Sequence, residues 1–359
     1  MKVLQVIESL TRGGAERLVV ELACEYARLG HESKVVCLSA PGPWARRLAD
    51  EGLYAGCLGK RRGFDPSIIG KVNGLIDDLA SDVVNTHLFT SNLWTRLAAL
   101  RRRDWALVVT LHNVDSWRRP HHRAIDCALA RVPDHYVAVG DEVERYWRGH
   151  GLPGARMTLI KNAVAWNGQK CPRPLANSNA IIRACGRLEP QKGFDVLVEA
   201  AGVLAGRTKG FVVEILGGGP ERGRLQGLIE TRGLTDRVKL VGERDGREFI
   251  AAADILVLPS RREGLPLVLL EALHAARPVV ASRLPSLVPV VADGREALLV
   301  EPDSPMALAC ALERLLADPI AARSMAEQGR ILAAREFSIE RAASSYIDVF
   351  TSVRRRCAK

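Results

Sequence analysis

The chain has 359 residues, which is long for a single hydrophobic core and suits two domains. Its apolar fraction of 47% is that of a globular protein, and no apolar run approaches the roughly 20 residues that a membrane-spanning helix needs. The net charge of +10 is spread over both halves and comes without zinc-finger spacing or an RNA-binding aromatic signature, so no nucleic-acid partner is expected.

Residues 1–8 have too short an apolar core for a signal peptide and reach a charge at Glu8. We therefore expect a cytoplasmic protein. Eight cysteines show neither a C-x-x-C pair nor a metal-like cluster, so we expect mostly buried, reduced thiols.

The chain opens with a strand, a glycine loop and a helix. Residues 3–7 are apolar, Gly13 and Gly14 follow in the loop, and apolar residues then recur at helical spacing from Leu18 to Leu29. This is the beginning of a doubly wound sheet, whose loop lies at the ligand-binding edge. The G-x-G-x-x-G dinucleotide fingerprint is missing. Adjacent glycines let backbone N–H groups approach a phosphate or sugar; the alternative is a glycine pair used only for turning.

Five further strands are expected in the first half of the chain. They alternate with helical patterns, which favours a parallel sheet covered on both faces; the strands are 33–38, 82–86, 107–111, 136–139 and 158–160. His87 and His112 directly follow two of them. Side chains at such positions point into the ligand crevice, although either histidine could instead be structural.

Two basic clusters lie in the same half, at residues 101–103 and, beside a tryptophan, at residues 117–123. Either could contact the anionic head groups of a membrane or a phosphorylated acceptor. The alternative is a solvated basic surface.

The region 167–179 is rich in proline, asparagine and serine, and has the composition of a linker. We place a first domain at residues 1–166 and a second at residues 175–338. Ser338 suits the N-cap of a last helix within residues 339–359, which we expect to return to the first domain.

The second domain repeats the scheme of strand, glycine-bearing loop and helix, here at 181–185, 186–193 and 194–204. Its first loop carries Arg187 and Lys192. An arginine and a lysine five residues apart can hold the oxygens of a diphosphate; the alternative is a surface pair.

Later elements continue this pattern. A glycine loop containing Gly218 and Gly219 follows the strand at 212–216 and would let a ligand come close. The other strands are expected at 238–242, 255–258, 278–281 and 297–300, and helices at 305–318 and 319–336.

The segment Glu263–Glu271 follows the strand at 255–258 and begins a helix. Pro266 fits the first helical turn, and Glu271 then lies in the second. Backbone N–H groups around Gly264 and Leu265 favour an anion such as phosphate. The two carboxylates repel an anion, so they suit hydroxyls on either side of it, as in a nucleotide sugar. The alternative is an amphipathic helix with two surface glutamates.

Five motifs, in order along both domains, together resemble the family-4 retaining glycosyltransferases of the GT-B fold. They are Gly13-Gly14-Ala15-Glu16, Thr110-Leu111-His112, Gly186-Arg187-Leu188 with Lys192-Gly193, Gly217-Gly218-Gly219-Pro220, and the pair Glu263 and Glu271. The resemblance implies an α/β protein with two doubly wound, Rossmann-like domains facing across a cleft. Ala163 departs from the glycine that is common in the family, at the hinge.

The resemblance also implies roles for single residues. Arg187 and Lys192 would hold the diphosphate of the donor, and Glu271 the ribose hydroxyls. Glu263 would contact the transferred sugar near the backbone amides of the Gly264-Leu265-Pro266 turn. Gly13 and Gly14 would approach the phosphates from across the cleft, and His112 would lie beside the sugar and the reaction centre.

The first hypothesis is therefore a retaining glycosyltransferase that moves a hexose from a UDP- or GDP-sugar to a glycan or lipid-linked acceptor. It would need no metal or other cofactor, since no Asp-x-Asp occurs and cationic side chains supply positive charge. We would place it in cell-surface polysaccharide or glycolipid synthesis, peripheral at the inner face of the membrane. The alternatives are a nucleotide-sugar epimerase or hydrolase on the same fold, and a non-catalytic nucleotide-sugar-binding module.

Overall fold

The computed structural model describes residues 1–101, 104–114, 120–166, 179–244 and 246–357. The chain divides into two compact units, Met1–Ala165 with Ile339–Lys359 (unit 1) and Trp166–Ser338 (unit 2). The expected linker lies almost wholly outside the described residues, and so do residues 102–103 and 117–119 of the two basic clusters.

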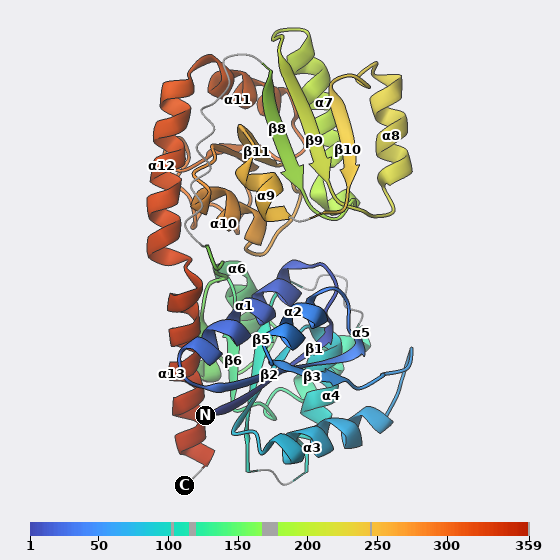
Figure 1. Ribbon diagram of the computed structural model, residues 1–359, viewed down its shortest axis with the longest axis vertical. Helices are drawn as coiled ribbons and strands as arrows, with labels where there is room; N and C mark the ends of the chain where they lie inside the picture. The colour runs from blue at the N-terminus through green and yellow to red at the C-terminus, as the bar shows by residue number, and fades with distance from the viewer. Residues whose placement is uncertain (102–103, 115–119, 167–178, 245, 358–359) are drawn as a thin grey trace. The chain divides into compact units, whose positions relative to one another are not determined.

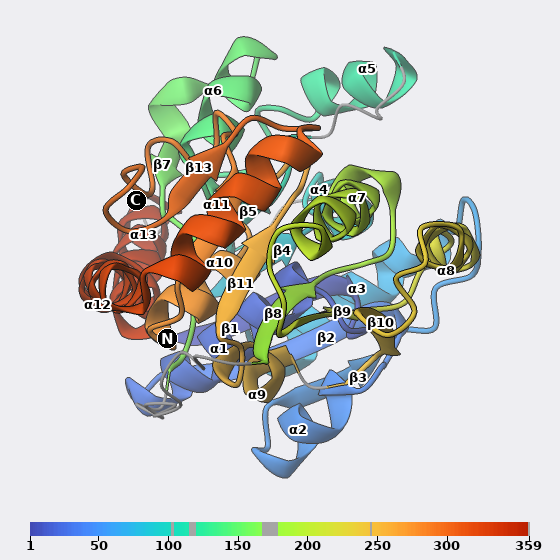
Figure 2. The same ribbon diagram turned by 90° about the horizontal axis from the view of Figure 1, so that it is seen from above.

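Unit 1 is built on a seven-stranded sheet in which every recorded strand pair is parallel, in the order β3-β2-β1-β4-β5-β6-β7. The order reverses between β1 and β4, where a doubly wound sheet leaves a crevice at the carboxyl ends of its strands. Figure 1 labels β1, β2, β3, β5 and β6, and Figure 2 labels β4 and β7. The strands are β1 (Lys2–Ser9), β2 (Glu32–Ala40), β3 (Tyr54–Cys57), β4 (Val83–His87), β5 (Ala106–Leu111), β6 (His135–Ala138) and β7 (Met157–Leu159).

Helices cover both faces of this sheet, which is why its strands read as nearly continuous apolar runs. One face packs against α1 (Gly14–Arg28), α2 (Trp44–Asp50) and α13 (Ile339–Cys357). The other packs against α3 (Ser67–Leu79), α4 (Phe89–Ala98) and α6 (Asp141–Gly149), while α5 (Pro120–Ala128) precedes β6.

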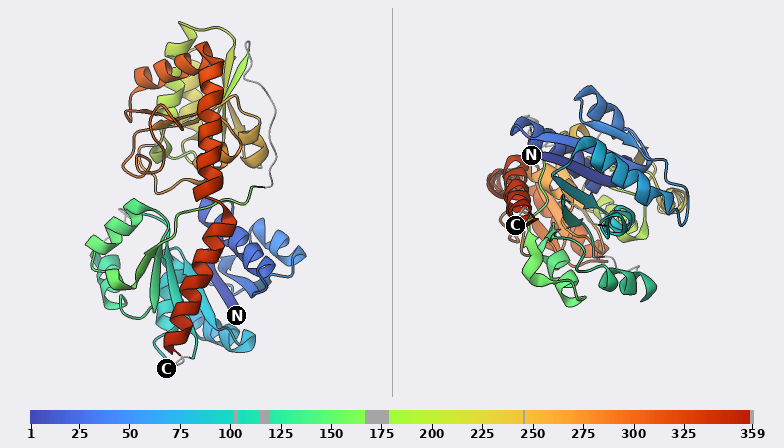
Figure 3. Two further views of the ribbon diagram at one scale, coloured as in Figure 1. Left: turned by 90° about the vertical axis from the view of Figure 1, so that its left-hand side faces the viewer. Right: turned by 90° about the horizontal axis from the view of Figure 1, so that it is seen from below.

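The last helix, α13, belongs to the core of unit 1 (Figure 3). Tyr346 and Phe350 are buried, and both meet the ring of Tyr26 in α1 edge to face, with ring centroids 6.5 and 5.7 Å apart. Aromatic pairs in this geometry add to the free energy gained from burying their area.

The sequence did not predict β3. This strand has four residues and includes a glycine at φ +115°. Among the described residues it pairs only with β2, at the edge of the sheet and through a shifted register. Glycine weakens a strand, and a short edge strand carries little apolar periodicity. The pairing with β2 therefore defines this strand, rather than local propensity.

Unit 2 contains a six-stranded sheet in the order β10-β9-β8-β11-β12-β13, again with every recorded pair parallel. Its order reverses between β8 and β11 (Figure 2). The strands are β8 (Ala180–Cys185), β9 (Phe211–Leu216), β10 (Val238–Gly242), β11 (Ile255–Leu258), β12 (Val279–Ser282) and β13 (Leu298–Val300).

Two sets of helices flank the sheet of unit 2. The first shares a hydrophobic core with the strands and consists of α7 (Phe194–Ala205), α8 (Arg222–Thr231) and α11 (Pro305–Ala317). In the second, α10 (Leu267–His274) packs against α9 (Gly246–Ala251) and α12 (Pro319–Glu336).

Two expectations need correction. The helix expected at 305–318 ends at Ala317, because the side chain of Asp318 accepts a hydrogen bond from Ala321 N at 3.0 Å and caps α12 instead. Of the six cysteines with a described environment, all are free thiols but only Cys37 is buried; Cys57, Cys127 and Cys310 are exposed. The last three lie on an edge strand and two helices, and helices also present residues to solvent.

Within the described part of the chain, none of the helices is both long enough and apolar enough to cross a bilayer.

Candidate functional site

Two loops of unit 2 meet where the strand order reverses. The β8 loop (residues 186–193) follows β8, and the β11 loop (residues 259–266) follows β11. The two strands are neighbours, with Ile182 level with Ile255 and Arg183 level with Leu256. Because both strands run in the same direction, both loops emerge at the same edge of the sheet.

An ion pair joins these loops. Lys192, at the end of the short 3₁₀ helix η2 (Pro190–Lys192), places Nζ 2.6 Å from Oε1 of Glu263. The hydroxyl of Ser260 donates to the same oxygen at 2.6 Å. The side chain of Glu263 is only 8% exposed and that of Lys192 is 22% exposed, so solvent screens the attraction weakly. The structure thus brings together two residues that the sequence placed on different parts of a ligand.

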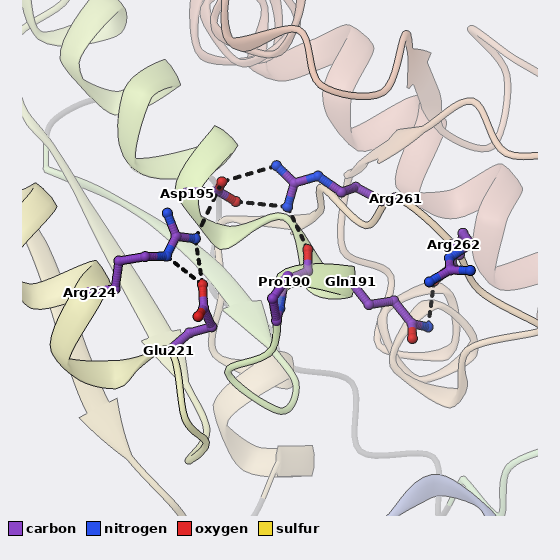
Figure 4. A pocket seen from close by; sticks show the side chains of 7 residues that line it. All are labelled: Pro190, Gln191, Asp195, Glu221, Arg224, Arg261 and Arg262. Atoms are coloured by element: carbon purple, nitrogen blue, oxygen red, sulfur yellow. Dashed lines mark hydrogen bonds and ion pairs between the residues drawn. The ribbon is translucent and has the colours of Figure 1, made fainter. Parts of the chain in front are cut away.

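A second set of contacts fixes the two loops against each other. Arg261 binds both carboxylate oxygens of Asp195 in α7 at 3.0 Å, and its backbone N–H donates to the carbonyl of Gln191 at 2.8 Å. The side chain of Gln191 in turn donates to the carbonyl of Arg262 at 2.9 Å. Figure 4 shows these groups around a polar hollow lined by Pro190, Gln191, Asp195, Glu221, Arg224, Arg261 and Arg262.

We call the contacts of Arg261 with Asp195 and Gln191 the loop clamp. The contact with Arg261 shifts the pKa of Asp195. Burial by itself would raise the pKa of Asp195, but the hydrogen bonds and charge of Arg261 outweigh it and lower the pKa below the ordinary aspartate value. Arg224 contributes a further ion pair at 3.4 Å. The sequence alone gives no role to Asp195, Ser260 or Arg261. The one available signal was an acidic residue in the first turn of α7.

Gly193 allows the β8 loop to turn back against the β11 loop. Its φ is +63°, and a Cβ added there would lie 2.0 Å from the carbonyl oxygen of Pro259. Both the left-handed backbone and the close approach require glycine. Gly193, which directly follows Lys192, therefore keeps that lysine beside the β11 loop.

The glycines at 217–219 pack one loop on another. A Cβ on Gly219 would lie 2.5 Å from the carbonyl oxygen of Leu188, whose N–H donates to the carbonyl of Gly218 at 2.8 Å. The three atoms nearest to a Cβ on Gly218 would all belong to the Glu243 side chain, with Oε1 at 2.4 Å. These contacts give the glycines a role in supporting the β8 loop, and their predicted contact with a ligand stays a prediction.

Arg187 differs from Lys192 in its surroundings. Its side chain is 72% exposed and lies 3.1 Å from Glu189 in an ion pair. Such an exposed pair contributes little to stability. Arg187 is therefore able to leave Glu189 at small cost and turn toward an anion.

Helix α10 begins one residue later than predicted. Pro266 is its N-cap, with φ −73° and an extended ψ of 128°, so this proline precedes the helix instead of lying in its first turn. Gly264 is half-buried and Leu265 is buried, so the side chain of Leu265 packs in the core. Glu271 lies in the second turn as predicted, but it is 2% exposed, which contradicts the alternative of two surface glutamates.

In unit 1 the predicted residues lie in or beside the segments that follow β1, β4 and β5. Gly13 is the N-cap of α1 and adopts an extended backbone, and Gly14 is the first helical residue, so neither needs glycine for a left-handed φ. His112 directly follows β5, and its Nε2 lies 3.0 Å from Nδ1 of His87, the last residue of β4. Burial lowers the pKa of His112 to about 4.

Comparison with known proteins shows the family of the chain. The family described as glycosyl transferases group 1 matches residues 172–331, and the one described as glycosyltransferase family 4 matches residues 12–165. A D-inositol 3-phosphate glycosyltransferase of Xylanimonas cellulosilytica is 30% identical over 305 residues, which cover 77% of this chain and 73% of that protein. The chain belongs to family 4 of the glycosyltransferases.

Two further known proteins are similar to this glycosyltransferase over almost its whole length. The lipopolysaccharide core biosynthesis glycosyltransferase LpsE of Rhizobium meliloti is 29% identical over 344 residues, 95% of this chain and 96% of that one. The structure of Anabaena HepE in complex with UDP-glucose superposes with a TM-score of 0.85 at 20% identity, covering 98% of this chain and 100% of that chain. The predicted GT-B fold and glycosyltransferase class are confirmed.

A first prediction concerns Gly193. We expect Gly193→Ala to destabilise unit 2 because a Cβ would collide with the Pro259 carbonyl, in addition to about 1–2 kcal/mol of strain from the left-handed backbone. The matched control is Gly233→Ala, whose φ is +65° but whose added Cβ would meet nothing within 4 Å. Denaturant unfolding should show a clearly larger loss for Gly193→Ala. Equal losses would mean that the loops can separate without cost.

A second prediction concerns pH. Because burial lowers the pKa of His112 from 6.5 to about 4, the unfolded chain binds more protons than the folded one between these values. The free energy of unfolding therefore does not depend on this ring above pH 6.5. It decreases by about 3 kcal/mol as the pH falls from 6.5 toward 4. Urea titrations from pH 7 to 4.5 should show this slope, and His112→Gln should reduce it. An unchanged slope in the variant would contradict the prediction.

Proposed function

We propose that this glycosyltransferase moves a hexose from a UDP- or GDP-sugar to a glycan or lipid-linked acceptor with retained anomeric configuration. The observation that carries the proposal is the ion pair of Lys192 and Glu263 at the reversal point of the unit 2 sheet. It brings a cation together with a carboxylate that would contact the sugar, at the edge where doubly wound sheets bind nucleotides.

The cations suit a diphosphate leaving group. Lys192 is held in place by Glu263 and by the loop clamp, and Arg187 is exposed and close in sequence. As the glycosidic bond to phosphate breaks, negative charge develops on the diphosphate, and preorganised cations stabilise that charge. The solved complexes of HepE with UDP and with UDP-glucose, on the same fold, support such a donor.

Glu263 fits a contact with the transferred hexose. Among the described residues, its recorded hydrogen bonds from Lys192 and Ser260 both fall on Oε1, so Oε2 can accept from a sugar hydroxyl. The buried carboxylate of Glu271 in the next turn would accept the ribose hydroxyls. We assign Gly13, Gly14, Gly218, Gly219 and the amides of the Gly264-Leu265-Pro266 turn to substrate binding, and His112 to the sugar.

No cofactor enters the proposal. Lys192 and Arg187 supply the positive charge that a metal ion gives in other transferases, so we expect transfer without added metal. Retention is consistent with this arrangement. The departing phosphate can take the proton of the incoming acceptor hydroxyl on the face that it leaves, and no separate general base is then required.

The proposed biological setting is supported by the name of one relative. LpsE is named for lipopolysaccharide core biosynthesis, which supports a role in cell-surface polysaccharide or glycolipid synthesis. A lipid-linked acceptor would bring the protein to the inner face of the membrane. The basic clusters at 101–103 and 117–123 are candidates for contact with anionic lipid.

The activity can be tested directly. A panel of nucleotide sugars is screened for thermal stabilisation, since a ligand at 100 times its dissociation constant adds about 2.7 kcal/mol. The best donor is then supplied with glycan and lipid-linked acceptors, and NMR of the anomeric proton reads the stereochemistry. An inverted product would overturn the mechanism, activity abolished by EDTA and restored by Mg²⁺ would overturn metal independence, and release of free sugar alone would indicate a hydrolase.

A third prediction concerns Lys192. Lys192→Ala should slow transfer by about 100- to 1000-fold and weaken binding of the nucleoside diphosphate, because a preorganised charge on the leaving group is lost. Lys209→Ala is the control. This exposed lysine precedes β9, so it lies at the amino ends of the strands, away from the candidate site. Steady-state rates and calorimetry with the nucleoside diphosphate provide the measurement. Wild-type turnover in Lys192→Ala would remove the lysine from the diphosphate site.

A further inference from the structure

A buried polar network lies inside unit 1 on the face of the sheet that α1 covers. It contains residues from three adjacent strands and one residue beyond them: Gln5 of β1, Asn85 and His87 of β4, Thr110 of β5, and His112, which directly follows β5. The first four are 0% exposed and His112 is 8% exposed. Polar groups at this depth cost free energy unless their hydrogen bonds are satisfied, so the pattern of bonds is informative.

The strand register explains why these side chains meet. Gln5 is level with Asn85, and His87 is level with Thr110. Residues two apart on a strand share a face, so Asn85 and His87 lie on the same side of the sheet as Gln5. The network therefore runs across the strands toward the carboxyl edge, where His112 lies.

The orientation of the Gln5 amide is set by its partners. Its Nε2 donates to the backbone carbonyl of Val19 in α1 at 3.0 Å, and a carbonyl can only accept. The oxygen Oε1 therefore faces the strands as an acceptor. It receives Nδ2 of Asn85 at 3.4 Å, and the Oδ1 of Asn85 accepts the Thr110 hydroxyl at 2.9 Å. Each of these three donor atoms thus has a recorded acceptor.

This orientation determines where the protons lie on the two histidines. The Nε2 of His87 is 2.8 Å from Oε1 of Gln5, which cannot donate, so this Nε2 carries the hydrogen. Burial lowers the pKa of His87 well below its ordinary value, so the ring is neutral and its Nδ1 has a lone pair. His112 must then donate from Nε2 to that Nδ1, across 3.0 Å. In a neutral ring the remaining Nδ1 of His112 is an acceptor.

We propose that Gln5 and His87 are positioning residues that hold His112 in its Nε2–H tautomer, so that His112 presents Nδ1 as a hydrogen-bond acceptor to a hydroxyl of the bound sugar. Within the described residues, Nδ1 of His112 has no hydrogen-bond partner. The contact with the sugar depends on the proposed function. The tautomer depends only on the network.

The Nε2–H tautomer of His112 has a chemical consequence for recognition. An acceptor at Nδ1 selects a group that carries a hydrogen, such as a sugar hydroxyl, and disfavours a second acceptor such as a phosphate oxygen. His112 is thereby assigned to the sugar and not to the diphosphate. The amide of Gln5, about two strands away, thus determines which hydrogen-bonding group His112 offers.

The decisive experiment reads the tautomers by NMR. Long-range ¹H–¹⁵N spectra of the ¹⁵N-labelled full-length protein at pH 7 should show His87 and His112 both in the Nε2–H form. The Nδ1–H form of His112 in the wild-type protein would overturn the proposal without any mutation. Because this measurement needs no turnover, it can succeed or fail independently of the proposed function.

Two variants of nearly equal shape then test the origin of the tautomer. Gln5→Met removes the acceptor for His87, so the Nε2–H form of His112 should give way to a mixture. Gln5→Glu is the conservative control, because a buried, protonated carboxyl keeps one acceptor oxygen and one donor O–H and should preserve the tautomer. An unchanged His112 tautomer in Gln5→Met would show that Gln5 does not set it.

Kinetics complete the test. Loss of one hydrogen bond to the sugar predicts a fall of about tenfold in kcat for Gln5→Met, with unchanged affinity for the nucleoside diphosphate and with most activity retained in Gln5→Glu. A merely structural role would lower the stability of both variants without separating kcat from nucleotide affinity. A changed tautomer with wild-type kcat would overturn the link to the sugar while leaving the glycosyltransferase assignment intact.

Discussion

Both units of this protein depend on one topological constraint. All strand pairs recorded in each sheet are parallel, so the loops that follow the strands emerge at one edge, and the strand order reverses once, between β1 and β4 or between β8 and β11. At a reversal the helices after the two neighbouring strands depart toward opposite faces, and the loops between them have room for a ligand. Lys192, Glu263 and His112 follow strands at or next to a reversal, and His87 is the last residue of β4.

The buried polar groups of the two sites are stabilised by different interactions. In unit 2, opposite charges neutralise each other, and the bidentate contact between Arg261 and Asp195 restrains the loops that carry them. In unit 1, neutral amides and rings exchange hydrogen bonds with no net charge, and burial keeps the rings unprotonated. A charged network suits stabilisation of a developing anion, whereas a neutral network with fixed donors and acceptors suits recognition of hydroxyl groups.

The strands, the helices and the ligand-binding edges of the two sheets could be predicted from the sequence, because they depend on the local spacing of apolar residues. Apolar runs with helices between them gave the parallel sheets, and glycine or histidine after a run marked the ligand edge. The sequence could not show that Lys192 contacts Glu263, because 71 residues separate them and strand order decides which loops are neighbours. It likewise missed Asp195, whose role depends on Arg261, and Gln5, a polar residue inside an apparently ordinary strand. Pro266 was misplaced by one residue, since proline suits an N-cap as well as a first turn.

The return of α13 to unit 1 bears on how the chain folds as it leaves the ribosome. Unit 2 is one continuous stretch, so it can complete its core before synthesis ends. Unit 1 is assembled from both ends of the chain, and until Tyr346 and Phe350 emerge, Tyr26 lacks the two rings that contact it in the folded protein. The domain that is translated first is therefore the last to finish folding, against the usual order of synthesis, and its α1 face stays exposed to chaperones or premature association until the final helix arrives.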